Sequence, residues 1–81
     1  MTGTVLVVED EDRLRVPVAK MIRRTGLTVI EAADGHHAVK PNEHEIAAVL
    51  LDMTLPGMNG PEVFAELREI RPDVKMILTT A

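Results

Sequence analysis

Carboxylates follow two apolar segments of this 81-residue chain. Glu9 and Asp10 come directly after the β-branched run at residues 4–8, and Asp52 follows the apolar run at residues 48–51. Short continuous runs of this kind are typical of strands that are buried on both faces of a parallel sheet. The carboxyl ends of parallel strands lie at one edge of the sheet, where ligands bind. If these two strands are neighbours, the three carboxylates converge at that edge.

Three converging carboxylates favour a divalent cation. Two carboxylates 4 Å apart repel each other by about 1 kcal/mol in water and by about 4 kcal/mol at an effective dielectric constant near 20. All-oxygen ligands in a chain without cysteine indicate Mg²⁺ or Mn²⁺. Mg²⁺ fits best because it takes one or two carboxylates, several waters and a phosphate oxygen.

Each acidic residue also has a simpler interpretation when it is taken alone. Acids are common in the first turn of a helix, where they complement the helix dipole, and we assign Glu11 and Asp12 to that role. Glu9 and Asp10 alone fit either interpretation equally well, and Asp52 alone would equally cap a loop. The combination of the three carries the prediction of a site.

The rest of the sequence predicts the elements that position these residues. Strands are predicted at residues 4–8, 28–30, 48–51 and 74–79. Helices are predicted after residue 12 with a stop at Gly26, within residues 36–45 where Pro41 should shorten or kink the helix, and from Pro61 to a break at Pro72. The apolar faces of the first and third helices consist of Leu14, Val18, Met21 and Ile22, and of Val63, Phe64, Leu67 and Ile70. This alternation of strands and helices implies an α/β fold, a parallel sheet with helices on both faces.

Composition limits the possible functions. The longest apolar run, residues 47–51, is far too short to span a bilayer, and the first residues lack the pattern of a signal peptide, so we expect a cytoplasmic protein without a membrane partner. The net charge is −4, with no basic stripe and a single aromatic residue, Phe64. Nucleic-acid binding by this chain is therefore not expected.

Three segments resemble the response-regulator receiver domain of two-component signalling systems. They are Val-Leu-Val-Val-Glu-Asp-Glu at residues 5–11, Leu-Leu-Asp-Met-Thr-Leu-Pro-Gly-Met-Asn-Gly at residues 50–60, and Ile-Leu-Thr-Thr-Ala at residues 77–81. They occur in the order of the family and extend the resemblance over essentially the whole chain. The most specific part is the apolar strand that ends in Asp52 and is followed by Pro-Gly-Met-Asn-Gly. The resemblance implies a flavodoxin-like doubly wound sheet with strand order 2-1-3-4-5.

The resemblance also implies a role for each matching residue. Asp52 would be the nucleophile that accepts a phosphoryl group from the phosphohistidine of a sensor histidine kinase or a phosphotransfer protein. Asp10 would bind Mg²⁺ directly, Glu9 would bind it through water, and Thr54 would offer its backbone carbonyl. Thr80 would donate a hydrogen bond to the phosphoryl oxygens and shift on activation.

The sequence departs from the family in two places. The acid pair of the family is more often Asp-Asp, whereas this chain has Glu9. The Lys-Pro that follows the fifth strand of the family has no counterpart, because Lys40 and Pro41 precede Asp52. We therefore expect residues 1–81 to form a receiver domain that lacks its last helix-strand-helix part, with strand order 2-1-3-4. The fourth strand would then be an apolar edge and could pair with a second copy in a homodimer.

Two other functions remain as alternatives. The missing lysine favours an interaction or structural fragment that keeps the receiver fold but does not switch. A metal-dependent phosphohydrolase with an aspartyl nucleophile is disfavoured, because Thr54 occupies the position where such enzymes usually carry a second Asp.

Residues 4–10 and the helix start at Pro61 also resemble receivers that are attached to hybrid sensor kinases. The arginines of the first helix form either a solvated face or a docking surface for a kinase: Arg13, Arg15, Arg23 and Arg24.

Overall fold

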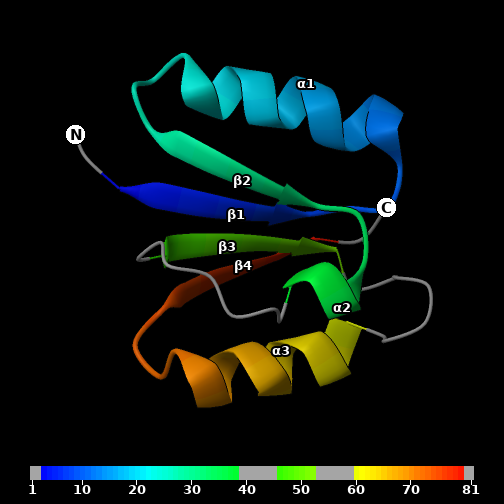
Figure 1. Cartoon of the computed structure of the whole chain (residues 1–81), viewed down its shortest axis with the longest axis vertical. Helices are drawn as coiled ribbons and strands as arrows, with labels where there is room; N and C mark the ends of the chain where they lie inside the picture. The colour runs from blue at the N-terminus through cyan, green and yellow to red at the C-terminus, as the bar shows by residue number, and fades with distance from the viewer. Residues whose placement is uncertain (1–2, 39–45, 53–59, 80–81) are drawn as a thin grey trace.

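The computed structural model describes residues 3–38, 46–52 and 60–79 of the chain (Figure 1). Strands and helices alternate along these residues. The elements are β1 (Thr4–Val8), α1 (Asp12–Arg23), β2 (Thr28–Ala32), α2 (Gly35–Ala38), β3 (Ile46–Asp52), α3 (Gly60–Ile70) and β4 (Lys75–Thr79). None of the helices in these ranges is long and apolar enough to cross a membrane.

The strands form one parallel sheet in the order β2-β1-β3-β4. Figure 1 shows α1 on one face of this sheet and α2 and α3 on the other. Both the predicted α/β class and the predicted order 2-1-3-4 are confirmed. In the register of the sheet, Val8 pairs with Leu51 and Asp52 pairs with Thr79. The carboxyl ends of β1, β3 and β4 therefore lie at one edge.

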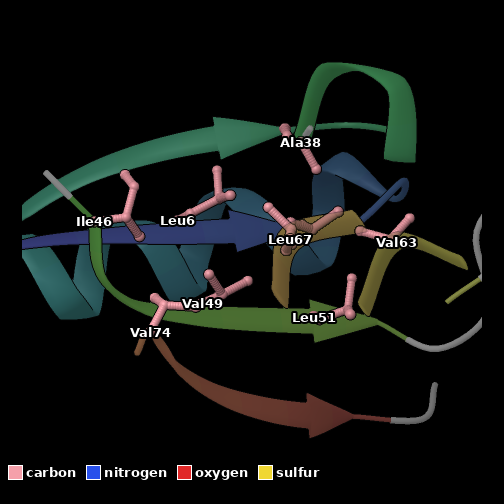
Figure 2. Packing of buried hydrophobic residues seen from close by; sticks show 10 residues of the cluster. Leu6, Ala38, Ile46, Val49, Leu51, Val63, Leu67 and Val74 are labelled. Carbon is pink, nitrogen blue, oxygen red and sulfur yellow. The ribbon is translucent and has the colours of Figure 1, made fainter. Parts of the chain in front are cut away.

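The larger core lies between the sheet and α3. Figure 2 shows Leu6, Val49 and Leu51 of the sheet packed with Val63 and Leu67 of α3, and each of these side chains is buried. Full burial of a Val or Leu side chain stabilises the folded state by about 1.5–3 kcal/mol. This core fixes the position of β3, and so of the residue that ends it.

A second core lies under α1, where Val7 of β1 packs with Ala19 and Val29. Val7 and its neighbour Val8 are both buried, although their side chains point to opposite faces of the sheet. Because β1 is covered on both faces, its sequence is a continuous apolar run instead of an alternating one.

Local chemistry sets the ends of the longer helices. The carbonyl of Glu11 accepts the N–H groups of Leu14 and Arg15 at 3.0 and 2.8 Å and so opens α1. Gly26 has a φ of +95°, in the left-handed region that glycine adopts without steric cost, and it turns the chain toward β2. Pro61 lies in the first turn of α3, where its missing N–H leaves no acceptor unsatisfied.

Several element boundaries differ from the predictions. β2 and β3 extend two residues further than predicted, to Ala32 and from Ile46. Both strands pair with the full length of β1, Ala32 with Val8 and Ile46 with Thr4. The chain bends at Asp34, whose carboxylate accepts the N–H of His37 at 2.8 Å and caps α2. The rest of the predicted helix, including Pro41, lies outside the described residues.

The predicted apolar face of α1 was partly wrong. The most buried residue of the helix is Ala19, and the partly buried Val18 and Ile22 pack beside it. The buried stripe is centred on these residues, so Met21 points away from the sheet and its exposed fraction is 66%. Ile70 is the last residue of α3, at the margin of its packed face, and is half exposed.

Candidate functional site

The carboxylates of Glu9, Asp10 and Asp52 cluster at the carboxyl edge of the sheet. One carboxylate oxygen of each residue lies within 4.8 Å of the corresponding oxygens of the other two. Asp52 is the last residue of β3 and only 2% exposed, whereas Glu9 is half-buried and Asp10 is exposed. The pairing of Val8 with Leu51 explains the cluster, because it places the residue after each of them side by side.

The surroundings of Glu9 disfavour the ionised form of its carboxyl group. Burial raises the pKa of the Glu9 carboxyl to about 7, and hydrogen bonds with Asp10 and Asp52 and the charge of Asp52 raise it as well. The N–H of Glu11 donates to Glu9 Oε2 at 3.2 Å and opposes this shift of the pKa. A proton on Glu9 relieves part of the repulsion within the cluster, and a divalent cation would relieve the repulsion between all three carboxylates.

Arg15 holds the segment that carries Glu9. Its Nη1 donates to the backbone carbonyl of Glu9 at 2.9 Å, and its Nε donates to Glu31 Oε1 at 3.2 Å. The Arg15 side chain is only 13% exposed. The sequence interpretation missed this residue because it grouped Arg15 by charge with the exposed arginines of α1. Its helical spacing to Ala19 and Ile22, which pack against the sheet, was the signal that places it on the inner face of the helix.

A groove of about 330 Å³ lies beside the carboxylates on the α1 face of the sheet. Its walls are mainly apolar, and Glu9 and Arg15 contribute the charged groups. Thr79, which lies next to Asp52 in the sheet, lines the groove and donates through Oγ1 to the carbonyl of Leu51 at 3.3 Å. The lining residues are Val7, Val8, Glu9, Leu14, Arg15, Val18, Leu50 and Thr79.

The structure thus brings together three of the five residues that the sequence assigned to the site. The other two, Thr54 and Thr80, lie outside the described residues. Of the arginines that were interpreted as one basic face, Arg15 and Arg23 both pair with Glu31 of β2, at 3.2 and 3.1 Å. These two arginines join the helix to the sheet and do not form a uniformly solvated face.

A doubly wound parallel sheet with an acidic cluster at the ends of its two inner strands defines an α/β domain suited to a cation and a phosphate group. The family model described as the response regulator receiver domain matches residues 5–81. The chain belongs to this family, and the predicted resemblance is confirmed. Membership of the family implies a phosphoacceptor role in two-component signalling. Receiver domains are signalling domains and not classical enzymes.

Relatives and solved structures agree with this assignment. The chain is 39% identical to the sensor kinase CckA of Brucella abortus over 98% of its own length and 9% of that protein. It is 42% identical to the sensory transduction protein RegX3 of Mycolicibacterium smegmatis over 96% of its own length and 34% of that protein. The chain therefore spans a minor part of these relatives.

The fold matches a response regulator whose structure contains magnesium. The protein TrrA from Thermotoga maritima, in complex with Mg(2+)-BeF, superimposes with a TM-score of 0.88 and 34% sequence identity, covering 98% of this chain and 70% of that one. The BeF3-activated receiver domain of DrrB superimposes with a TM-score of 0.87 and 26% identity, covering 99% of this chain and 67% of that one.

Proposed function

We propose that this domain accepts a phosphoryl group on Asp52 from the phosphohistidine of a histidine kinase or phosphotransfer protein, in a reaction that depends on Mg²⁺. The observation that carries the proposal is the position of Asp52, the buried member of the acidic cluster at the end of an inner strand. The similarity to proteins named as a sensor kinase and a sensory transduction protein supports the same pathway.

Asp52 is suited to act as the nucleophile because its backbone is held firmly. β3 pairs with β1 on one side and with β4 on the other, and the preceding Leu51 is fully buried. In the transfer, a carboxylate oxygen of Asp52 bonds to phosphorus while the P–N bond of the phosphohistidine breaks, and the bonding electron pair stays on the imidazole nitrogen. Phosphoryl transfer requires positioning more than covalent assistance, and a rigid carboxylate provides that positioning.

The donor set of the cluster fits magnesium. Glu9, Asp10 and Asp52 supply carboxylate oxygens alone, which suit a hard cation. By the family pattern, the carbonyl of Thr54 would complete the protein ligands and Thr80 would contact the phosphoryl oxygens. Bound Mg²⁺ supplies neutralisation of the charge on the phosphoryl oxygens. Glu9 is one methylene longer than the aspartate more usual in the family, so its carboxylate would approach a bound ion on a longer side chain.

Phosphorylation by phosphoramidate tests this function, since that compound carries the same kind of P–N bond as phosphohistidine. We expect intact-mass spectrometry to detect one added phosphoryl group when MgCl₂ is present and none when EDTA replaces it. A folded chain that binds Mg²⁺ and yet gains no phosphoryl group would refute the proposal. That outcome would favour the alternative of an interaction module that does not switch.

A further inference from the structure

We propose that Arg15 is a positioning residue for the acidic site, one that fixes the segment carrying Glu9 and Asp10. This inference rests on the proposed function and deepens it, because it assigns a role to a residue outside the acidic cluster. The site needs such a device: carboxylates that repel one another must be held together before a cation arrives.

The guanidinium group of Arg15 links three elements. Nη1 donates to the carbonyl of Glu9 at the end of β1, at 2.9 Å, and Nε donates to Glu31 of β2 at 3.2 Å. Nη2 donates to the carboxylate of Asp12 in the first turn of α1. A guanidinium carries five N–H donors in a rigid plane and can serve three acceptors at once. With the Arg15 side chain only 13% exposed, its bonds to Glu9 and Glu31 are partly shielded from competing water, whereas Asp12 is exposed.

These contacts complete the restraint of Glu9. Its backbone N–H donates to the carbonyl of Ala32 at 3.0 Å, and its carbonyl accepts from Arg15. Its side chain accepts the N–H of Glu11 at 3.2 Å. Both peptide groups that flank the Cα of Glu9 are therefore anchored, which fixes the direction of its side chain and the starting point of Asp10. Arg15 supplies the anchor on the side of Asp10.

Arg23 provides a matched control on the same helix. It also donates to Glu31, at 3.1 Å, and to a backbone carbonyl of β2, that of Val29, at 3.1 Å. The contacts of Arg23 are with β2, whereas those of Arg15 include the Glu9 carbonyl. Loss of either arginine removes an ion pair between α1 and β2, but only the loss of Arg15 releases the segment that carries Glu9 and Asp10.

The test compares Arg15→Met with Arg23→Met in the whole chain. Titration calorimetry with MgCl₂ should show the Kd for Mg²⁺ rising about tenfold or more for Arg15→Met, the effect typical of residues that orient metal ligands, and less than about twofold for Arg23→Met. Arg15→Lys should not restore the affinity, because one ammonium group cannot reproduce the planar three-way contact. If Arg15→Met does not fold, Arg15→Lys replaces it in the comparison.

Hydrogen exchange in the metal-free proteins gives a second readout. The amides of Glu9 and Glu11 should exchange faster in Arg15→Met than in Arg23→Met, after correction for the global stability of each variant in urea. Equal Mg²⁺ affinity and equal exchange in the two variants would overturn the role of Arg15. A wild-type chain that takes no phosphoryl group from phosphoramidate would overturn the proposed function alone, since exchange and Mg²⁺ affinity decide the role of Arg15 separately.

Discussion

Carboxylate oxygens of Glu9 and Asp52 lie within 4.8 Å of each other at the ends of the two inner strands of the sheet. The two residues are 43 positions apart in the sequence, yet the parallel register of β1 and β3 places them side by side. Buried side chains hold both strands, and Arg15 holds the segment after β1, so the backbone leaves the two carboxylates little room to separate. The repulsion between the two carboxylates is therefore relieved by protonation or by a bound cation.

The raised pKa of Glu9 predicts that metal-free stability falls as the pH rises. In the unfolded chain the Glu9 carboxyl titrates near 4.5, whereas in the folded chain its pKa is about 7. Below pH 4.5 both states hold the proton, and between the two values the folded state holds it more strongly. The proton-linked stability is thus present at low pH and is lost as the pH rises through about 7.

Urea unfolding of wild type and Glu9→Gln, both in EDTA, measures this effect. Because Glu9 is partly exposed, we expect a loss of on the order of 1–2 kcal/mol for wild type relative to the variant across this pH range. Saturating Mg²⁺ should remove most of the difference. Parallel stability curves for the two proteins would show that Glu9 does not titrate as described.

Mg²⁺ should stabilise the fold through the acidic cluster. A ligand at ten times its Kd stabilises a folded protein by about 1.4 kcal/mol, which corresponds to a rise of several degrees in the Tm of a domain of this size. Asp10→Asn should abolish most of this rise, because Asp10 supplies one of the three carboxylates. Asp73→Asn, in the exposed turn before β4, is the control and should retain it. A Tm that does not move in millimolar MgCl₂ at constant ionic strength is incompatible with a formed site.

Leu67 should be the most sensitive position of α3. It is fully buried against the sheet, and replacement by Ala leaves a cavity as well as losing transfer free energy, at a cost of about 2–5 kcal/mol. Ile70→Ala on the same helix removes a half-exposed side chain and should cost less than about 1 kcal/mol. Urea unfolding of the two variants checks this order. Equal losses would place the core elsewhere.

Self-association through β4 is a further prediction. Among the described strands β4 pairs only with β3, and its side chains Ile77 and Leu78, on opposite faces, are 50% and 47% exposed. An apolar edge strand is a template for pairing with a second copy. We expect the 81-residue chain to form dimers at high micromolar concentration, and Ile77→Lys to weaken them.

Light scattering measures this association. Met21→Lys replaces a side chain that is also exposed, but on α1, and it should leave the dimers intact. A wild-type chain that is monodisperse and monomeric at the same concentration would contradict the prediction.

The strands and the acidic residues could be predicted because they depend on local patterns. A continuous apolar run is the signature of an inner parallel strand, and the residue after such a run lies at the ligand-binding edge of the sheet. Glu9 and Asp52 could therefore be placed at one edge from the sequence alone. The lengths of β2 and β3 could not, because pairing with β1 extends them beyond their most apolar residues.

Arg15 shows the limit of prediction from residue type. Arginine is usually exposed, so its charge suggested a solvated or docking face. Burial of its guanidinium depends on acceptors from two other elements, the carbonyl of Glu9 and the carboxylate of Glu31, whose meeting is a property of the tertiary structure. The helical spacing of Arg15 to Ala19 and Ile22 indicated a position on the inner face of the helix. The prediction gave more weight to its charge, which favours an exposed position.

Identification of the phosphorylated residue tests the central claim most directly. After treatment with phosphoramidate and MgCl₂, reduction with borohydride converts an acyl phosphate to a stable alcohol, which peptide mass spectrometry locates. We expect the modification at Asp52 alone, and Asp52→Asn should remove it while the variant remains folded by circular dichroism. Modification that persists in Asp52→Asn, or that maps to Glu9 or Asp10 in the wild type, would contradict the assignment of Asp52 as the phosphoacceptor.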